Sequence, residues 1–197
     1  MTQFIPPKSN RPVVLGVCGA SGQIYARWVL KILVEELGIS TRVIISNAAK
    51  KIIPDELGSE NLFEGLPAER IVVEEETNME SELASGSVPT AGMILCPCSL
   101  NTLAAVASGI SDNLIKRAAQ VHLKQRRKLI IAVREMPVGT IDLENMLRLS
   151  QAGAVVTPIS PPFYHHPVTI DDLAKFTAQK IVQLLIDFDG GIQYAPH

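Results

Sequence analysis

Short apolar runs alternate along the chain with longer segments in which apolar residues recur every three or four positions. The short runs, each of which predicts a buried strand, lie at 13–15, 42–45, 91–95, 129–133 and near Val155. The longer segments predict amphipathic helices from the glycine-rich turn at 16–22 to near Gly38, and at 100–108, 113–125, 141–152 and 169–186, the last started by Thr169 as its N-cap. This alternation is typical of a parallel sheet covered by helices on both faces. We therefore predict a three-layer α/β/α domain with an open, mostly parallel sheet of the Rossmann or flavodoxin-like type.

The pattern is weaker between the second and third long strands. Residues 46–57 predict a short helix or turn, 58–67 a loop, and 71–73 a short strand. The acidic run at 74–76 is expected to be a solvated surface. A loop of small residues at 84–87 precedes the third long strand.

Length and charge restrict the possible function. A chain of 197 residues with 47% hydrophobic content favours a single domain over 1–197, with tails at about 1–11 and 187–197. Its 18 basic and 20 acidic residues give a net charge of -2, so we expect neither nucleic acid nor an anionic membrane as a partner. We find neither a membrane-spanning run nor a signal peptide pattern, and therefore expect a cytoplasmic protein.

The cysteines do not indicate a metal site. Cys18, Cys96 and Cys98 are odd in number and lie at the ends of predicted strands, which suits reduced thiols. The spacing of Cys96 and Cys98 is wrong for a zinc knuckle, and no second ligand pair follows.

Two turns that follow predicted strands could receive an anion. Gly16-Val-Cys-Gly-Ala-Ser-Gly22 follows the first strand, and a hydroxyl- and amide-rich turn from Ser99 to Thr102 follows the third long strand. The glycine spacing departs from a dinucleotide fingerprint, and the second strand ends in Ser46-Asn47 rather than in an acidic residue. Both departures count against NAD. The first turn alone could also be a tight turn that binds no ligand, but the presence of the second turn favours a mononucleotide phosphate.

Several charged residues have both a structural and a functional interpretation. Arg117 and Lys124 lie seven residues apart on one predicted helix face and could face a phosphate, whereas Arg126-Arg-Lys128 suits a solvated helix end. Arg134 and Glu135 follow a buried strand, where open α/β sheets build their sites, although a surface ion pair is the alternative.

These motifs, taken in order, resemble the flavin prenyltransferase family (UbiX-type), part of the flavin-binding group that includes the flavin cysteine decarboxylases. The resemblance covers about 12–185. The matching segments are Gly19-Ala-Ser-Gly22, Ser46 with Ala48-Ala49, Ala84-Ser-Gly-Ser87, Cys96-Pro-Cys-Ser-Leu-Asn-Thr102, Asp112-Asn-Leu-Ile-Lys-Arg-Ala-Ala119, Arg134-Glu-Met-Pro137, Leu143-Glu-Asn-Met-Leu147, Gly153-Ala154 and Phe163-Tyr-His165.

The resemblance implies that a dimethylallyl group passes from its monophosphate to N5 and C6 of reduced FMN. The product, prenylated FMN, would serve a UbiD-type decarboxylase; no metal would be required, and the chain would form a homo-oligomer, commonly a dodecamer. By resemblance, FMN would be held by Gly19, Ala20, Ser21, Ser46, Ser99, Leu100, Asn101, Thr102 and Arg134. The donor phosphate would be held by Ser85, Arg117, Lys124, Tyr164 and Lys180. Ser21 and Glu56 would move protons, and Glu135 would help to arrange the phosphate site.

Two departures and two rival functions accompany this resemblance. Position 180 is lysine where relatives carry arginine, and Tyr194 stands in for a C-terminal tryptophan found in some relatives.

One rival is a flavin cysteine decarboxylase, which would place a histidine soon after the second strand, yet 46–57 contains none. The other is a non-catalytic flavin-binding subunit, which would lack the phosphate cations that Arg117, Lys124 and Lys180 provide.

Overall fold

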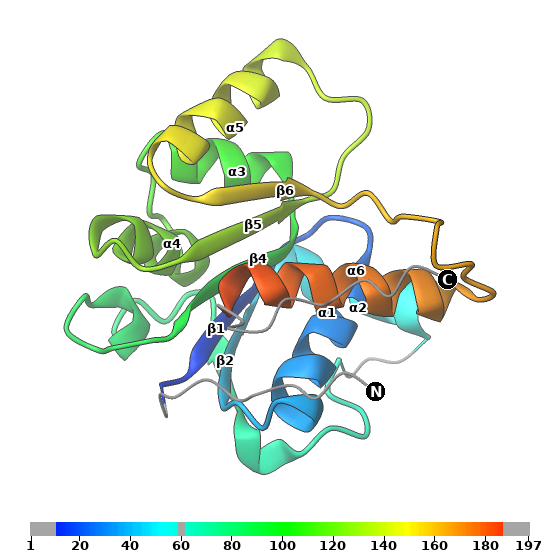
Figure 1. Ribbon diagram of the computed structural model, residues 1–197. Coiled ribbons are helices and arrows are strands. Elements are labelled where there is room, and N and C mark those ends of the chain that lie inside the picture. Colours follow the sequence, from blue (N-terminus) through cyan, green and yellow to red (C-terminus); the bar gives the residue numbers. More distant parts are fainter. Residues whose placement is uncertain (1–10, 59–61, 187–197) are drawn as a thin grey trace.

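The computed structural model describes residues 11–58 and 62–186 (Figure 1). Within these residues, six strands form one sheet in the order β3-β2-β1-β4-β5-β6, and every neighbouring pair is parallel. The strands are β1 (Val13–Val17), β2 (Thr41–Ile45), β3 (Ile71–Glu75), β4 (Gly92–Cys98), β5 (Leu129–Val133) and β6 (Val155–Pro158). This is the Rossmann strand order, which reverses between β1 and β4. The prediction of an open, mostly parallel sheet is confirmed.

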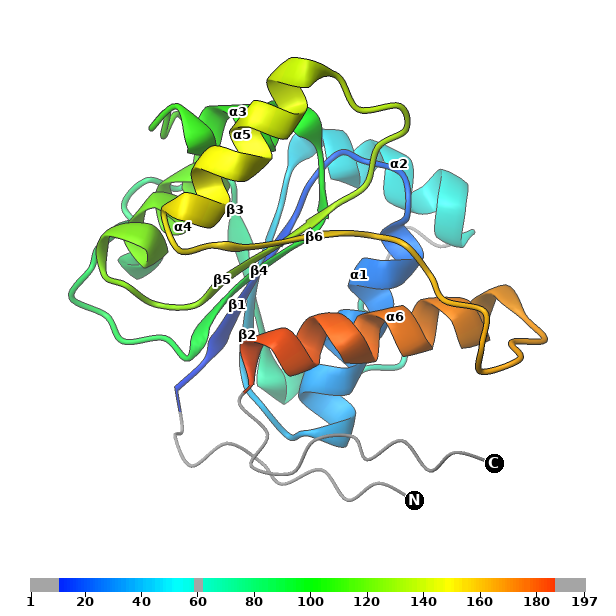
Figure 2. The same ribbon diagram turned by 45° about the horizontal axis from the view of Figure 1, so that its top comes forward.

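Helices cover both faces of the sheet. They are α1 (Gln23–Lys31), α2 (Asn47–Leu57), α3 (Leu100–Ala107), α4 (Leu114–Lys124), α5 (Thr140–Gln151) and α6 (Ile170–Leu185). Figures 1 and 2 show α1, α2 and α6 on one side of the sheet and α3, α4 and α5 on the other. A π-helical turn (Ile32–Glu36) continues α1, and two 3-10 turns lie at Ala68–Arg70 and Glu82–Ala84.

Two apolar clusters fill the layers between sheet and helices. Alternate residues of β1 point to opposite faces, so Leu15 joins the cluster with α1 and α6, and Val14 joins the cluster with α3 and α4. The residues of β1, β4 and β5 are all buried, which explains why these strands appear in the sequence as continuous apolar runs.

Polar N-caps determine where several helices begin. Ser46, Ser99 and Asn113 each accept a hydrogen bond from a backbone amide of the helix that follows. Thr169 Oγ1 accepts from the amide of Asp172 at 3.1 Å, and Asp172 Oδ2 accepts from the amide of Thr169 at 2.8 Å, a capping box that confirms the predicted start of α6.

The acidic run at 74–76 is not the solvated surface that we expected. Glu74 is 8% exposed and pairs with the guanidinium of Arg42, whose Nε lies 3.0 Å from Glu74 Oε1. Glu76 is 9% exposed and also has hydrogen-bond partners, whereas Glu75 between them is exposed and pairs with Lys50. Successive side chains of an extended strand point to opposite sides, so Glu74 and Glu76 share one side and Glu75 lies on the other.

Some expectations fall outside the described residues. The tails at 1–11 and 187–197 lie there except for Arg11, and so does Tyr194. Among the residues that are described, no helix is both long and apolar enough to cross a membrane.

Candidate active site

The two predicted anion-receptive turns lie at one edge of the sheet, on either side of the point where the strand order reverses. β1 and β4 are parallel neighbours, with Gly16 opposite Leu95, so the turns that follow them emerge side by side. The amide of Cys18 also donates to the carbonyl of Pro97 at 3.2 Å. Ligands of open α/β sheets bind at this kind of crevice.

The first turn requires glycine at two positions. A Cβ on Gly19 would lie 2.3 Å from the Cβ of Ala48, so only glycine allows the turn to pack against α2. Gly22 has a φ of 101°, in the left-handed region that other residues rarely adopt. Ser21 lies exposed between these glycines.

Glu56 from α2 contacts the start of α1 directly. Its Oε2 accepts from the amides of Gly22 at 2.8 Å and Gln23 at 2.7 Å. These are amides that a phosphate would otherwise use at a helix N-terminus. Glu56 is exposed, but its carboxylate is held at the start of α1, one residue from Ser21. The first turn therefore presents Gly19, Ala20 and Ser21 rather than the end of α1.

Two further helix N-termini carry hydroxyl groups at the same edge. Ser46 Oγ accepts from the amide of Ala49 at 3.1 Å at the start of α2. Ser99 Oγ accepts from the amide of Thr102 at 3.3 Å and donates to Thr102 Oγ1 at 3.2 Å at the start of α3, where Leu100 and Asn101 follow. Hydroxyls and outward-facing amides at helix N-termini suit a nucleotide phosphate.

Arg134 brings a guanidinium to the first turn from the end of β5. Its amide donates to the carbonyl of Cys98 at 3.2 Å, and its Cγ would lie 3.7 Å from a Cβ placed on Gly22. Burial raises the pKa of the neighbouring Tyr25, and the positive charge of Arg134 opposes that rise. With Ser46, Ser99 and Thr102, this cation adds to the polar groups that could receive a phosphate at this edge of the sheet.

Buried thiols lie beneath both turns. Cys18, Cys96 and Cys98 are free and buried. The thiols of Cys18 and Cys98 hydrogen bond each other, which lowers the pKa of Cys18 and raises that of Cys98. Burial raises the pKa of Cys96. Among residues 11–58 and 62–186, no group of three or more His, Cys, Asp or Glu side chains could hold a metal ion.

Apart from the two turns, a polar hollow of about 480 Å³ lies beside α4. Ser85, Arg117 and Lys124 line it, so the seven-residue spacing does place both cations on one surface. Arg117 Nε donates to the carbonyl of Ala84 at 2.9 Å, which orders the loop that carries Ser85.

Arg127 also fixes this loop, which corrects our interpretation of 126–128 as a solvated helix end. Its guanidinium is half-buried and donates to the carbonyls of Val88 and Gly86, both at 2.7 Å. The sequence did not predict this role, because the two carbonyl partners precede Arg127 by 39 and 41 residues in the chain.

The remaining predicted phosphate residues lie elsewhere in the chain. Tyr164 packs edge-on against Phe176 of α6, with ring centroids 5.7 Å apart, and Lys180 Nζ lies 5.6 Å from the centroid of the same ring. Neither residue lines the hollow at Arg117, because α6 and α4 cover opposite faces of the sheet. Glu135 is exposed, and its Oε1 accepts from the amide of Met136 at 3.0 Å.

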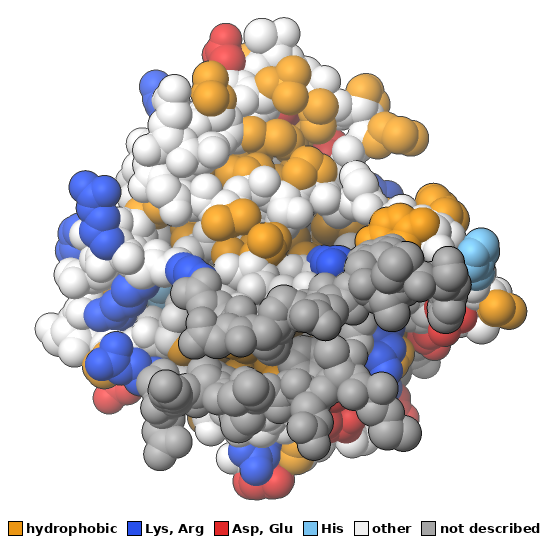
Figure 3. All heavy atoms as spheres, viewed as in Figure 1, with side chains coloured by type: hydrophobic (Ala, Val, Ile, Leu, Met, Phe, Trp, Pro, Cys, Tyr) orange, Lys and Arg blue, Asp and Glu red, His pale blue; other side chains and the backbone are white. Residues whose placement is uncertain are grey.

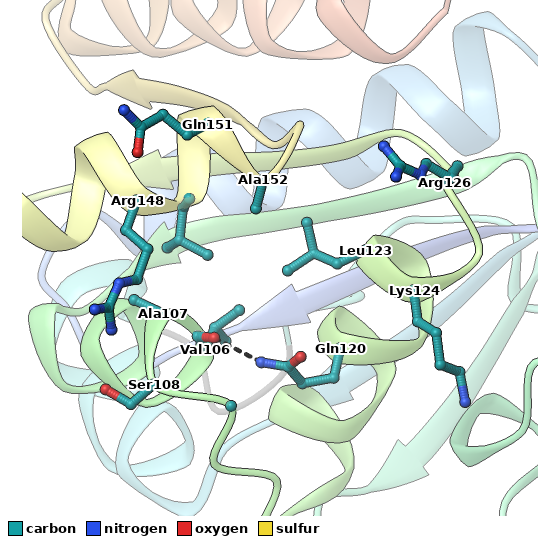
Figure 4. Close-up of a pocket in the computed structure, with 12 residues that line it drawn as sticks. Val106, Ala107, Ser108, Gln120, Leu123, Lys124, Arg126, Arg148, Gln151 and Ala152 are labelled. Carbon is teal, nitrogen blue, oxygen red and sulfur yellow. Dashed lines mark hydrogen bonds between the residues drawn. The ribbon is translucent and has the colours of Figure 1, made fainter.

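A groove of about 600 Å³ lies on the other side of Lys124, between the C-terminal ends of α3, α4 and α5 (Figure 4). Lys124, Arg126 and Arg148 border it, and Gln120 Nε2 donates to the carbonyl of Val106 at 2.6 Å. Cations at helix C-termini neutralise the carbonyl ends of those helices. The groove is therefore a poor second anion site, although it is rich in positive charge.

Large apolar side chains are exposed around α5 and the segment before α6. Figure 3 shows apolar side chains gathered over this upper face and along its right-hand side. The set includes Met136, Ile141, Leu143, Leu147, Phe163, Val168 and Ile170. In the segment before α6, His165 stacks on Phe176 with ring centroids 4.2 Å apart, and both nitrogens of its ring are buried without a hydrogen-bond partner. An exposed apolar face of this extent is typical of a protein interface.

Comparison with known sequences identifies relatives over nearly the whole chain. A family model described as Flavoprotein matches residues 6–188. The flavin prenyltransferase UbiX of Aquifex aeolicus is 44% identical over 177 residues, which cover 88% of this chain and 92% of that protein. UbiX of Thermoplasma acidophilum is 42% identical over 173 residues, with 88% and 93% of the two chains covered.

Solved structures show the same similarity. AnUbiX in complex with FMN and dimethylallyl pyrophosphate has a TM-score of 0.83 and 35% identity, covering 89% of this chain and 92% of its own. A dodecameric FMN-dependent UbiX-like decarboxylase from Escherichia coli has a TM-score of 0.81 and 35% identity, covering 87% and 93%. The cypemycin decarboxylase CypD, at 16% identity and a TM-score of 0.56 over 86% and 94% of the two chains, shares the fold alone.

Proposed function

The chain belongs to the flavoprotein family, among the UbiX-type flavin prenyltransferases, and from this membership we propose that it transfers a dimethylallyl group from dimethylallyl phosphate to reduced FMN. The new bonds form at N5 and C6, and the product is prenylated FMN. The observation that supports the proposal is a pair of separate regions suited to anions, the turns at the strand-order reversal and the hollow at Arg117 and Lys124.

The first region binds FMN. We assign its contacts to the two turns, to the cap of α2 and to the end of β5, namely Gly19, Ala20, Ser21, Ser46, Ser99, Leu100, Asn101, Thr102 and Arg134. Reduced FMN, when bound, supplies the nucleophilic nitrogen and carbon, so the chain itself needs neither a nucleophile nor a divalent metal. The helix N-termini and Arg134 hold and orient its phosphate.

The second region binds the donor phosphate. Breaking an allylic C–O bond leaves charge on the departing phosphate, and fixed cations stabilise that charge better than mobile water does. Arg117 is already oriented by its bond to the carbonyl of Ala84, while Lys124 and the Ser85 hydroxyl lie on the same hollow. An aromatic face, assigned to Tyr164, stabilises the allylic cation without attacking it.

Protons move through Ser21 and Glu56. Ring closure breaks the double bond of the prenyl group, which gains a proton as C6 loses one, and the carboxylate of Glu56 lies beside the turn that carries Ser21. Glu135, exposed next to Arg134, helps to arrange the phosphate region.

Assembly completes the donor site. Tyr164 and Lys180 lie on the α6 side of their own chain, remote from the hollow at Arg117, so we assign their contribution to the hollow of a neighbouring copy. The exposed apolar face beside them supports a homo-oligomer, which we propose is a dodecamer. A cytoplasmic location and delivery of the product to a UbiD-type decarboxylase complete the proposal.

Anaerobic incubation with reduced FMN and dimethylallyl phosphate tests the reaction. The flavin, analysed by mass spectrometry, should gain the mass of one dimethylallyl unit. Dimethylallyl diphosphate, run in parallel, determines which donor is used, and oxidised FMN serves as the control. An unchanged flavin mass with both donors would contradict the proposed function.

A further inference from the structure

One buried carboxylate contacts the amino ends of two helices. Glu76 directly follows β3, and its Oε1 accepts from the amide of Asn47 at 2.8 Å. Its Oε2 accepts from Asn113 Nδ2 at 2.9 Å, and its backbone carbonyl accepts from the amide of Leu114 at 2.7 Å. Asn113 Oδ1 in turn caps α4 by accepting from the amide of Lys116 at 3.0 Å.

The two helices that Glu76 joins lie on opposite faces of the sheet. α2 packs through Ala49 and Ile53 into the cluster that contains α1 and α6. α4 packs through Ile115 and Ala118 into the cluster that contains α3. The two helices therefore pack in separate clusters, and Glu76 connects them directly at the edge strand β3.

Each joined helix end belongs to a different ligand region. Ser46, assigned to FMN, immediately precedes Asn47, whose amide Glu76 holds. Arg117, assigned to the donor phosphate, lies in the first turn of α4, and its amide donates to the carbonyl of Asn113 at 2.9 Å.

We propose that Glu76 is a positioning residue that sets the FMN-binding end of α2 and the phosphate-binding end of α4 relative to each other. The inference rests on the proposed function, because transfer requires the two ligands to meet at a defined separation. Small displacements of reacting groups are costly to such a reaction. Glu76 acts through Ser46 and Arg117 and does not itself touch a ligand.

Glu76→Gln tests the link with little change in shape. Gln Oε1 can still accept from Asn47, but Gln Nε2 faces Asn113 Nδ2, so two donors oppose each other. We expect the Kd for FMN, measured by flavin fluorescence, and the KM for dimethylallyl phosphate to rise together, each about tenfold. Glu75→Gln is the matched control, because Glu75 is exposed and pairs with Lys50, and both constants should stay at the wild-type values.

A second change provides the rescue. In Glu76→Gln with Asn113→Asp, Gln Nε2 donates to one Asp oxygen, and the other Asp oxygen caps α4. Both constants should return toward wild type. Constants that stay at wild type in Glu76→Gln while the melting temperature falls would overturn the inference, and so would failure of the double variant to recover them.

The same experiment separates this inference from the proposed function. If the wild-type protein fails to prenylate FMN, the proposed function is wrong. Loss and recovery of FMN affinity would still decide whether Glu76 controls the end of α2. If the wild-type protein is active and Glu76→Gln equals it in both constants, only the positioning role is overturned.

Discussion

At the level of single residues, Glu56 has two backbone hydrogen bonds that hold its carboxylate beside Ser21. One oxygen, Oε2, accepts both of them, from Gly22 and Gln23. The side chain therefore fixes the start of α1 with Oε2, and the proposed role in proton transfer would fall to its other oxygen. These two roles can be separated by mutation.

Glu56→Gln should retain both ligands and slow the reaction. Gln Oε1 can accept from both amides, so the turn keeps its shape, but an amide cannot accept the proton released at C6. We expect kcat to fall about a hundredfold with little change in the Kd for FMN. Asp55→Asn, at the exposed neighbouring position, is the control. Wild-type kcat in Glu56→Gln would limit Glu56 to its role at the start of α1.

Several residues could be placed from the sequence, and others could not. The sequence predicted the cap Thr169 because a hydroxyl N-cap has a local cause, and it placed Ser46 and Ser99 at turns after strands without predicting that they cap helices. Burial of the two glutamates depends on distant partners. Glu74 pairs with Arg42, 32 residues away in the chain, and Glu76 pairs with Asn113, 37 residues away. Such partners become neighbours only in the folded sheet, so we interpreted the acidic run as solvated.

At the level of elements, α4 connects the donor hollow to the loops around it. His122 on this helix is 1% exposed; its Nε2 lies 2.8 Å from Thr90 Oγ1, and its Nδ1 lies 2.7 Å from the carbonyl of Ala118. Burial lowers the pKa of His122 from 6.5 to about 4. The imidazole is therefore neutral in the folded protein at neutral pH, and it serves structure rather than catalysis.

The low pKa of His122 predicts a loss of stability in mild acid. The unfolded chain binds a proton near pH 6.5 and the folded chain only near pH 4, so stability falls as the pH decreases through this window. The loss should approach about 3 kcal/mol at the lower end. Urea unfolding of wild type and His122→Gln between pH 7 and 4 measures it. A slope equal in the two proteins would show that His122 does not titrate on unfolding.

The elements themselves were largely predictable because their periodicity is strong. The strand predicted at 129–133 coincides with β5, and the helix predicted at 113–125 agrees with α4 to within one residue at each end. The prediction from sequence was weakest at β3, which it placed only at 71–73. This edge strand has Val72 and Val73 exposed, so its apolar residues do not form the pattern of a buried strand. The strand order depends on long-range pairing, which no local pattern encodes.

At the level of the whole molecule, the fold divides the predicted donor-phosphate residues between its two faces. Ser85, Arg117 and Lys124 lie near α4, whereas Tyr164 and Lys180 lie with α6. A sequence comparison can name such residues, but it does not show that one chain cannot bring them together.

Mixed oligomers test this division. Lys124→Ala and Lys180→Ala should each raise the KM for dimethylallyl phosphate and leave the Kd for FMN unchanged. When the two variants are co-expressed, some sites receive an intact hollow from one chain and Lys180 from another, so activity should exceed that of either variant alone. Arg117→Ala co-expressed with Lys124→Ala is the control, because both changes affect one hollow and no intact site can form. Absence of recovery in the first mixture would show that the site lies within one chain.

The carboxylate at the start of α1 also has a consequence for cofactor choice. A dinucleotide bound in the Rossmann manner places its pyrophosphate on the amides at the first helix. Here Glu56 already occupies the amides of Gly22 and Gln23, and its charge would repel a pyrophosphate. An internal carboxylate thus leaves these two amides unavailable to the pyrophosphate of a nicotinamide dinucleotide, although the strand order is the one that such cofactors commonly use.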